Sequence, residues 1–397
     1  MSNLETHGQL KVFLVAGEHS GDALGGRLMQ ALNSKSHARM SFAGVGGEHM
    51  AAHDLRSIFP LADVAVMGPL AILGSLPRLV SRVHRTVDAA IGWRPDVVVI
   101  IDSPEFTHPI ARRIRKRLPG VPILDYVSPS VWAWRPGRAR KMRAYVDHVL
   151  ALLPFEPDAH ARLGGPACTY VGHPMIEQLD WLRALDPAPL ARRLGLDSAR
   201  PVLVVLPGSR VSEVTRLAPI FGAAVHKFAA REGLPQVIVP TVASVRPLVE
   251  QAAARWGFPV HIIEGEEDKF RAFKLARAAL AASGTVTLQL GLAGTPMVVA
   301  YKVDGVAAKL RFLLKVHSVV LANLVLGDNV FPELLQEDCN AEKLSETLSS
   351  IMAETPMRAA QLQALGKIPA RMALDHGTPS ERAAEIVLAE LARSPLR

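Results

Sequence analysis

The chain has few cysteines and few aromatic residues. Its two cysteines, Cys168 and Cys339, lie far apart and outside any CxxC spacing, so we expect neither a disulfide framework nor a zinc site. Aromatic residues make up 5% of the chain, and they do not alternate with Arg and Lys as they do in proteins that bind single-stranded nucleic acid. We therefore expect no metal and no nucleic-acid partner.

The chain also lacks the usual targeting and repeat signals. The apolar run after Lys11 is interrupted at Glu18, which is too soon for a secretory signal peptide. No low-complexity segment and no repeat of the length typical of solenoids is evident. A GxGxxG fingerprint is missing after the first predicted strand, so a dinucleotide is not implied and we expect no cofactor. These absences favour a cytoplasmic protein.

Apolar and basic residues are abundant. Hydrophobic residues make up 49% of the 397 positions, and 45 Lys and Arg against 37 Asp and Glu give a net charge of +8. A chain of this length is expected to form two domains. Its basic balance suits a phosphorylated substrate or an anionic membrane surface.

Residues 278–301 form the longest stretch without a charged side chain. Glycines and Pro296 interrupt it, which excludes a membrane-spanning helix. We predict a strand over 278–282, a turn at Ser283, Gly284 and Thr285, a helix over 286–292 and a strand over 296–303. Such a turn directs backbone N–H groups at a phosphate; the alternative is an ordinary turn with small residues for packing.

A second turn of this kind follows residues 201–206. The run PVLVVLPGSR predicts a buried strand that ends at Gly208, Ser209 and Arg210. A guanidinium matches two phosphate oxygens at once. Together with the Ser283 turn, this pattern predicts a ligand that contains a diphosphate.

The N-terminal turn is rich in polar residues. Residues 11–16 predict a strand and residues 23–32 a helix, with Glu18, Ser20, Gly21 and Asp22 between them. Ser20 or Asp22 is expected to cap the helix. Glu18 at the end of the strand is either a ligand or catalytic contact, or a solvated carboxylate.

Residues 94–106, RPDVVVIIDSPEF, predict a strand that ends in Asp102. A carboxylate at the C-terminal end of a buried parallel strand is partly desolvated, which raises its pKa and suits a general base. The alternative is an N-cap for the next helix. After the following strand, Ser128 and Trp132 belong to a Trp-x-Trp loop that either walls an acyl or sugar site or packs internally.

Residues 64–87 combine apolar and basic side chains. Met67, Leu70 and Leu73 are followed by Arg78 and Arg82 at helical spacing. This pattern suits a helix that enters one leaflet of a membrane, and it also fits a core helix with a solvated basic face.

Strands and helices alternate along both halves of the chain. This order predicts an α/β fold with two doubly wound, Rossmann-like parallel sheets facing a central cleft. We expect a membrane-facing domain over 1–185, a domain over 200–345 that binds the diphosphate-containing ligand, and C-terminal helices over 346–397 that pack back on the first domain. In the second domain, Asn323 is expected to reach the ligand.

Several motifs together resemble one family. The set is VAGEHSGD, VMG, IDSPEF, YVSPSVWAWRPGR, LPFEP, VGHP, LPGSR, SGT and NLVLG. It covers nearly the whole chain and resembles lipid-A-disaccharide synthase, an inverting glycosyltransferase family of the GT-B type.

The resemblance implies a reaction and a location. It implies that UDP-2,3-diacylglucosamine condenses with 2,3-diacylglucosamine 1-phosphate to give a β(1→6) disaccharide and UDP in lipid A biosynthesis. It also implies a metal-independent enzyme, peripheral on the cytoplasmic face of the Gram-negative inner membrane, and a homodimer. This favours the membrane interpretation of residues 64–87.

The resemblance carries roles to four matching positions and leaves two departures. Asp102 matches the proposed general base, Glu18 a second essential acid, and Arg210 and Asn323 substrate-site residues. Related transferases carry glutamate where Gln289 stands, to hold the ribose hydroxyls, and Ala322 stands where a proline is expected. These departures leave open a non-catalytic or altered-donor UDP-sugar-binding protein of the same fold; an enzyme like UDP-GlcNAc 2-epimerase is a third alternative.

Overall fold

The apolar runs of the sequence become the strands of two parallel sheets. The computed structural model describes residues 9–36, 38–64, 69–303 and 318–393, with the backbone alone over 69–76. The chain forms two compact units. Unit 1 comprises Met1–Glu177 and Leu374–Arg397, and unit 2 comprises Gln178–Ala373.

Unit 1 is built on a six-stranded sheet of order β2-β1-β3-β4-β5-β6, in which every pairing is parallel. Its strands are β1 (Leu10–Ala16), β2 (Met40–Val45), β3 (Val97–Ile101), β4 (Ile123–Tyr126), β5 (His148–Ala151) and β6 (Ala167–Tyr170). Its helices are α1 (His19–Lys35), α2 (Glu48–Ala51), α3 (Pro69–Trp93), α4 (Pro104–Arg117), α5 (Gly137–Met142), α6 (Glu156–Leu163) and α17 (Pro379–Arg393), with 3-10 turns at Leu61–Asp63 and Pro174–Gln178.

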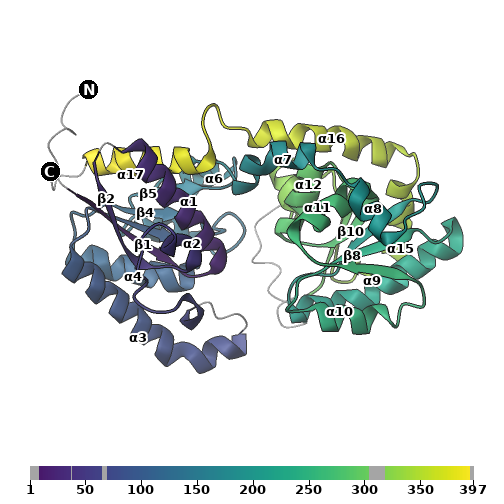
Figure 1. The fold of residues 1–397 in the computed structure, drawn as a ribbon, viewed down its shortest axis with the longest axis horizontal. Coiled ribbons are helices and arrows are strands. Elements are labelled where there is room, and N and C mark those ends of the chain that lie inside the picture. Colours follow the sequence, from purple (N-terminus) through teal and green to yellow (C-terminus); the bar gives the residue numbers. More distant parts are fainter. Residues whose placement is uncertain (1–8, 37, 65–68, 304–317, 394–397) are drawn as a thin grey trace. The chain divides into compact units, whose positions relative to one another are not determined.

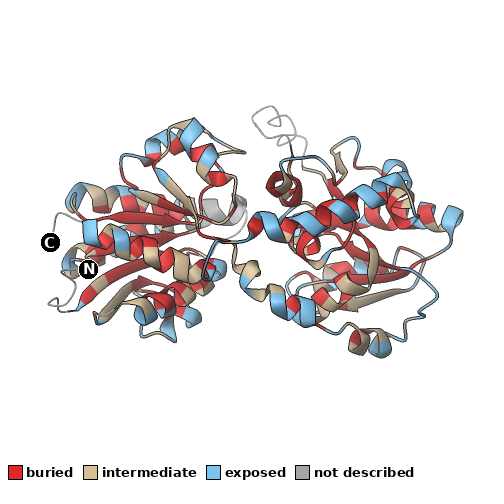
Figure 2. Cartoon of the chain, turned by 90° about the horizontal axis from the view of Figure 1, so that it is seen from above, coloured by how far each residue is buried: buried red, intermediate tan, exposed pale blue. Residues whose placement is uncertain are grey.

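Helices cover both faces of this sheet. β3 has the sequence VVVII and all five of its residues are buried, as expected of a parallel strand enclosed on both sides. α3 packs against α4 on one face, and α1 packs against α17 on the other (Figure 1). The burial pattern agrees, since the central strands are buried, the edge strands β2 and β6 are mostly half-buried, and the helices alternate between buried and exposed residues (Figure 2).

Unit 2 repeats this architecture with the strand order β12-β11-β10-β7-β8-β9. Its strands are β7 (Val202–Leu206), β8 (Gln236–Pro240), β9 (Val260–Ile263), β10 (Ala276–Ala282), β11 (Met297–Tyr301) and β12 (Glu333–Leu335). Its helices are α7 (Leu179–Ala184), α8 (Ala188–Leu194), α9 (Val211–Glu232), α10 (Arg246–Ala253), α11 (Glu266–Leu275), α12 (Thr285–Ala293), α14 (Leu321–Leu326), α15 (Ala341–Met352) and α16 (Pro356–Met372).

Strand adjacency brings distant loops together in each unit. β7 pairs with β10 in unit 2, and β1 pairs with β3 in unit 1, where Ala16 is opposite Ile101. In a parallel sheet the C-terminal ends of neighbouring strands lie at the same edge. The turns after β7 and β10 are therefore neighbours, and so are the turns after β1 and β3.

The chain passes between the units more than once. Residues 180–200 contain α7 and α8 and belong to unit 2. Of the C-terminal helices, α15 and α16 also belong to unit 2, and α17 returns to α1 of unit 1. Lys35 of α1 pairs with Glu385 of α17 at 3.0 Å.

Candidate functional site

A cavity of about 300 Å³ lies at the C-terminal edge of the unit 2 sheet. The turns after β7 and β10 form it, because these strands are neighbours. Seven of the eight residues predicted to bind a donor line this cavity. They are Gly208, Ser209, Arg210, Ser283, Gly284, Thr285 and Gln289.

Glu213 holds the turn that carries Arg210. Its carboxylate accepts a hydrogen bond from the Ser209 backbone N–H at 3.1 Å and pairs with the Arg210 guanidinium at 3.0 Å. Gly208 has φ of +118°, and a Cβ there would lie 2.5 Å from Cβ of Glu213, so only glycine fits. The side chain of Arg210 remains 66% exposed, which leaves N–H donors for an anion.

The positive end of α12 supplies the other side of the cavity. Gly284 precedes this nine-residue helix and provides no side-chain cap. The N–H groups in the first turn of α12 therefore face the edge of the cavity, where they can stabilise an anion. The Ser283 hydroxyl donates a hydrogen bond to the Val319 carbonyl at 2.7 Å, which ties this turn to the segment before α14.

Three cavity residues have no signal in a nearby motif. Glu213 is in the first turn of α9, Thr241 follows β8, and Lys269 lies on α11. The Thr241 hydroxyl is buried and has no hydrogen-bond partner among the described residues. Thr241 directly follows the apolar strand β8, and this position at a strand end is the one feature of the sequence that could have indicated it.

Asn323 does not line this cavity. It is fully buried, and its amide nitrogen donates to the Phe331 carbonyl and to Glu333, each at 2.9 Å. Its oxygen accepts from the backbone N–H groups of Val330 and Phe331. The whole amide is thus used to fix the segment before β12.

In unit 1, acidic and strained residues gather at the ends of β1, β3 and β4. Asp102 and Ser103 have φ of +55° and +44°, and Val127 has φ of +85°. Such values are costly for residues with a Cβ and cluster at functional sites. A Cβ at Gly17 would lie 2.3 Å from Cβ of Ser103, so this glycine makes room for the strained turn.

Asp102 has the environment of a base. Burial raises the pKa of its carboxyl, and the negative charges of Glu18 and Asp125 raise it further. The Ser103 backbone N–H at 2.7 Å and the Ser20 hydroxyl at 3.4 Å donate to the carboxylate and partly offset this. Glu18 itself precedes α1 without capping it.

Asp22 and Gly21 are structural. Asp22 is 1% exposed, and its carboxylate accepts from the backbone N–H groups of Gly47, His49 and Met50 at 2.6, 3.0 and 3.1 Å. Asp22 therefore fixes the start of α2. It does not cap α1, and the expectation of a cap at this residue is wrong. Gly21 is buried, and a Cβ there would lie 3.2 Å from the Ile101 carbonyl oxygen.

The Trp-x-Trp loop is anchored from within. The Trp132 indole N–H donates to Glu156 at 3.1 Å, and Ser128 lies 2.9 Å from His160 Nε2. Glu156 is buried, and this burial raises its pKa to about 7. Of the two interpretations of this loop, internal packing accounts for these contacts, and Glu156 was not predicted.

Part of the proposed membrane segment lies outside the described residues. Met67 is one of these positions, and for Leu70 and Leu73 the backbone of α3 alone is described. Arg78 is exposed, whereas Arg82 pairs with Asp63 at 2.6 Å and lies over the Phe59 ring.

The described residues offer neither a membrane-spanning helix nor a cluster of metal ligands. No described helix combines the length and the apolar character needed to cross a bilayer. The same residues contain no group of three or more His, Cys, Asp or Glu side chains placed to hold a metal ion.

Solved structures with the same architecture share little sequence with this chain. UDP-GlcNAc 2-epimerase from Neisseria meningitidis, solved with UDP-GlcNAc, matches with a TM-score of 0.63 and 11% identity over 97% of this chain and 100% of that one. A glycosyltransferase from Rickettsia africae gives 0.60 and 10% over 98% and 100%. These likenesses and the two parallel sheets confirm the predicted α/β fold of GT-B type.

Sequence relatives identify the family. Residues 12–387 match the family model described as lipid-A-disaccharide synthetase. The lipid-A-disaccharide synthase of Rhodopseudomonas palustris (strain HaA2) is 50% identical over 388 residues, 98% of each chain, and that of Ruegeria pomeroyi is 42% identical over 391 residues, 96% of each. The chain therefore belongs to the lipid-A-disaccharide synthase family of glycosyltransferases.

Proposed function

We propose that this protein transfers 2,3-diacylglucosamine from its UDP derivative to the 6-hydroxyl of 2,3-diacylglucosamine 1-phosphate. The products are UDP and a β(1→6)-linked disaccharide 1-phosphate. The observation that carries the proposal is the joining of the two phosphate-type turns in one cavity, in a chain 50% identical to a lipid-A-disaccharide synthase.

The cavity of unit 2 is proposed to hold the UDP moiety. As the bond between the sugar and the diphosphate breaks, its electron pair leaves with the diphosphate. Arg210 and the N–H groups at the start of α12 stabilise that negative charge by directed hydrogen bonds. Because these donors come from the protein, we propose that the reaction needs no divalent metal.

Asp102 is proposed to act as the general base. It takes the proton of the acceptor hydroxyl while the hydroxyl oxygen attacks the anomeric carbon from the face opposite the leaving diphosphate, which inverts that centre. A raised pKa makes Asp102 a stronger base than an ordinary aspartate. Glu18 supports this role through its charge, which raises the pKa of Asp102.

The enzyme is proposed to work as a peripheral protein on the cytoplasmic face of the inner membrane. Both proposed substrates carry acyl chains, so the apolar and basic segment 64–87 has a natural partner in the lipid surface. Arg78, an exposed residue of α3, is placed to meet anionic headgroups; Arg82 is already paired with Asp63.

The test is disaccharide formation from the two acylated substrates in detergent, with EDTA present. We expect disaccharide and UDP in equal amounts. Asp102→Asn should lower kcat by a factor on the order of 10² to 10⁴, while the control Asp88→Asn, an exposed acid paired with Arg117, should not.

The remaining outcomes separate the alternatives. If UDP-sugar binds and no product forms, the protein is a non-catalytic binder, and Gln289 is the first residue to examine. If product forms from a different UDP-sugar, the donor preference is altered. A wild-type rate in Asp102→Asn would remove Asp102 from the role of base.

A further inference from the structure

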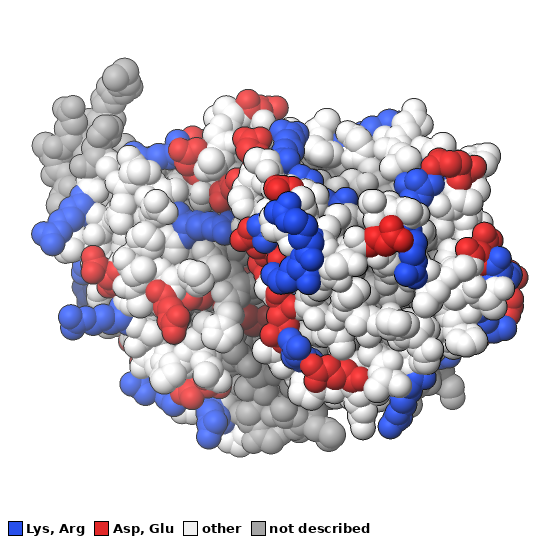
Figure 3. All heavy atoms as spheres, turned by 45° about the vertical axis from the view of Figure 1, so that its right-hand side comes forward, with Lys and Arg blue, Asp and Glu red and all other residues white. Residues whose placement is uncertain are grey.

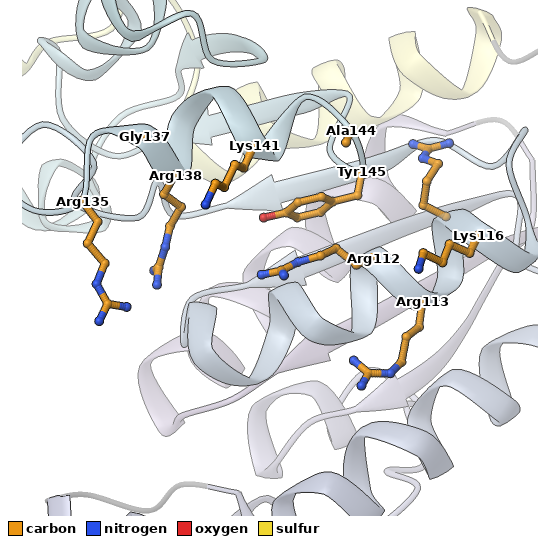
Figure 4. A pocket seen from close by; sticks show the side chains of 10 residues that line it. Arg112, Arg113, Lys116, Arg135, Gly137, Arg138, Lys141, Ala144 and Tyr145 are labelled. Carbon is orange, nitrogen blue, oxygen red and sulfur yellow. The ribbon is translucent and has the colours of Figure 1, made fainter.

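A groove of about 780 Å³ lies between α4 and α5 of unit 1. Seven of its ten lining residues are Arg or Lys. Figure 4 shows the ends of Arg112, Arg138 and Lys141 directed into the space beside the Tyr145 hydroxyl. A volume of this size is within the range of ligand sites, about 300–1,000 Å³. We call this feature the α4–α5 groove.

Most of its cations have no carboxylate partner. Arg138 pairs with Glu105, and Arg115 pairs with Asp147. The other five cations of the groove have no ion pair with any described residue. These five are Arg112, Arg113, Lys116, Arg135 and Lys141. By contrast, basic and acidic side chains are interspersed on the molecular face seen in Figure 3.

The floor of the groove is rigid. Tyr145 is buried, and its hydroxyl lies 3.0 Å from Nδ1 of His108, whose Nε2 lies 3.0 Å from the carboxylate of buried Asp125. Arg112 stacks over the Tyr145 ring at 5.1 Å. An arginine held in this way loses less side-chain entropy when it binds an anion than a freely rotating one.

The Arg112 end of the groove is distant from the Asp102 centre. Arg112 is eight residues after Pro104, which places it about 12 Å along α4 from the end next to Asp102, whereas Arg138 pairs with Glu105 in the first turn of that helix. A phosphate on the sugar whose hydroxyl reaches Asp102 would lie within one sugar ring of that carboxylate. An anion held at the Arg112 end is therefore a different one.

We propose that the α4–α5 groove binds the phosphate headgroup of an anionic membrane phospholipid. α4 packs against α3, and Arg117 of α4 pairs with Asp88 of α3 at 2.7 Å. One wall of the groove, α4, therefore packs against the helix whose N-terminal part carries the proposed membrane segment. This membrane setting rests on the proposed function; the cationic groove itself does not.

The experiment measures co-sedimentation of the full chain with vesicles of phosphatidylcholine, with and without phosphatidylglycerol, at physiological ionic strength. The test variant is Arg112→Gln with Lys141→Gln. The control, Arg39→Gln with Arg162→Gln, removes the same charge from exposed positions of unit 1 outside the groove. Each basic residue near an anionic surface contributes about 1 kcal/mol, so the test variant should bind phosphatidylglycerol vesicles about 30-fold more weakly.

The control should change this binding less than about threefold, because exposed charges distant from the surface are screened by salt. Equal losses in both variants would mean diffuse electrostatic attraction and would overturn the proposal. Unchanged binding of the test variant would do the same. Inorganic phosphate titrated against the vesicle complex separates the sources: displacement at low millimolar phosphate would identify a site for free phosphate and not for a lipid.

The outcome does not depend on transferase activity, because the assay contains no sugar nucleotide. A protein that makes no disaccharide and still shows the difference between the two variants would refute the proposed function and leave the groove assignment intact. Circular dichroism of both variants confirms that each is folded.

Discussion

Glu156 is expected to make folding stability depend on pH near neutrality. Its carboxyl group is buried, with Trp132 Nε1 at 3.1 Å and the Leu153 backbone N–H at 3.0 Å. These donors favour the ionised form, but burial outweighs them and raises the pKa from 4.5 to about 7. Replacing Glu156 with Gln removes the titrating group and retains a side chain of similar size.

The sign and magnitude follow from the two pKa values. Between pH 4.5 and about 7 the folded protein holds a proton on Glu156 that the unfolded chain has lost, so stability falls as pH rises through this window and is unaffected outside it. The interval is about 2.5 units, at about 1.4 kcal/mol per unit. As pH rises from 4.5 to about 7, the unfolding free energy of the wild type should therefore fall by about 3 kcal/mol relative to that of Glu156→Gln.

The assay is urea unfolding of both proteins from pH 4.5 to 8, with the Trp132 indole N–H followed by NMR and assigned with Trp132→Phe. The difference in unfolding free energy between wild type and variant should fall across the window, and the indole signal should titrate near pH 7. Glu105→Gln is a control of opposite sign, because the hydrogen bond from Arg138 lowers the pKa of Glu105. A difference independent of pH would refute the assignment of a buried, protonated Glu156.

Three further predictions concern unit 2. Asn323→Ala leaves the backbone N–H groups of Val330 and Phe331 without their acceptor and removes one of the donors to Glu333, and it should cost about 3 kcal/mol in urea unfolding, with UDP affinity of the folded fraction nearly unchanged; a selective loss of affinity would place Asn323 in the site. Gly222→Ala places a Cβ 2.1 Å from Trp256 and should lower unfolding free energy by about 2 kcal/mol or more, whereas an unchanged midpoint would contradict this close packing. Gln289→Glu should tighten UDP binding about three- to tenfold by calorimetry if this residue holds the ribose, and weaker binding would exclude that role.

Strands were the easiest elements to predict. The expected strands over 11–16, 201–206 and 278–282 agree with β1, β7 and β10 to within two residues at either end. Short apolar runs bounded by proline, glycine or charged residues have few structures other than a buried parallel strand. Sequence therefore indicated both sheets and, through the strand ends, the turns that form the unit 2 cavity.

Helix starts were less accurate. α1 begins at His19 and not at residue 23, because the polar residues and glycine after Glu18 resemble a turn although the chain is already helical there. The helix after the Ser283 turn begins at Thr285, one residue earlier than expected. Helix starts depend on backbone geometry that polar residues and glycine leave open.

Polar residues within motifs can serve the backbone. Asp22 and Asn323 each belong to a motif, and their side chains satisfy backbone N–H groups 25 to 28 and 7 to 8 residues away. Glu156 is a residue of the loop that the sequence did not indicate, because its partner Trp132 lies 24 residues away along the chain. Whether a polar side chain meets a ligand or the backbone depends on loops that local sequence does not place.

The two candidate centres concentrate opposite charge by different physical means. In unit 2, positive character comes from backbone N–H groups at the start of α12 and from Arg210, which is exposed and so avoids a large desolvation cost. In unit 1, Asp102 is held on a strained backbone among other carboxylates, and both burial and charge raise its pKa. A group transfer needs one centre that stabilises a leaving anion and another that removes a proton. Each unit has the charge that one of these tasks requires, so damage to either centre should leave ligand binding at the other intact.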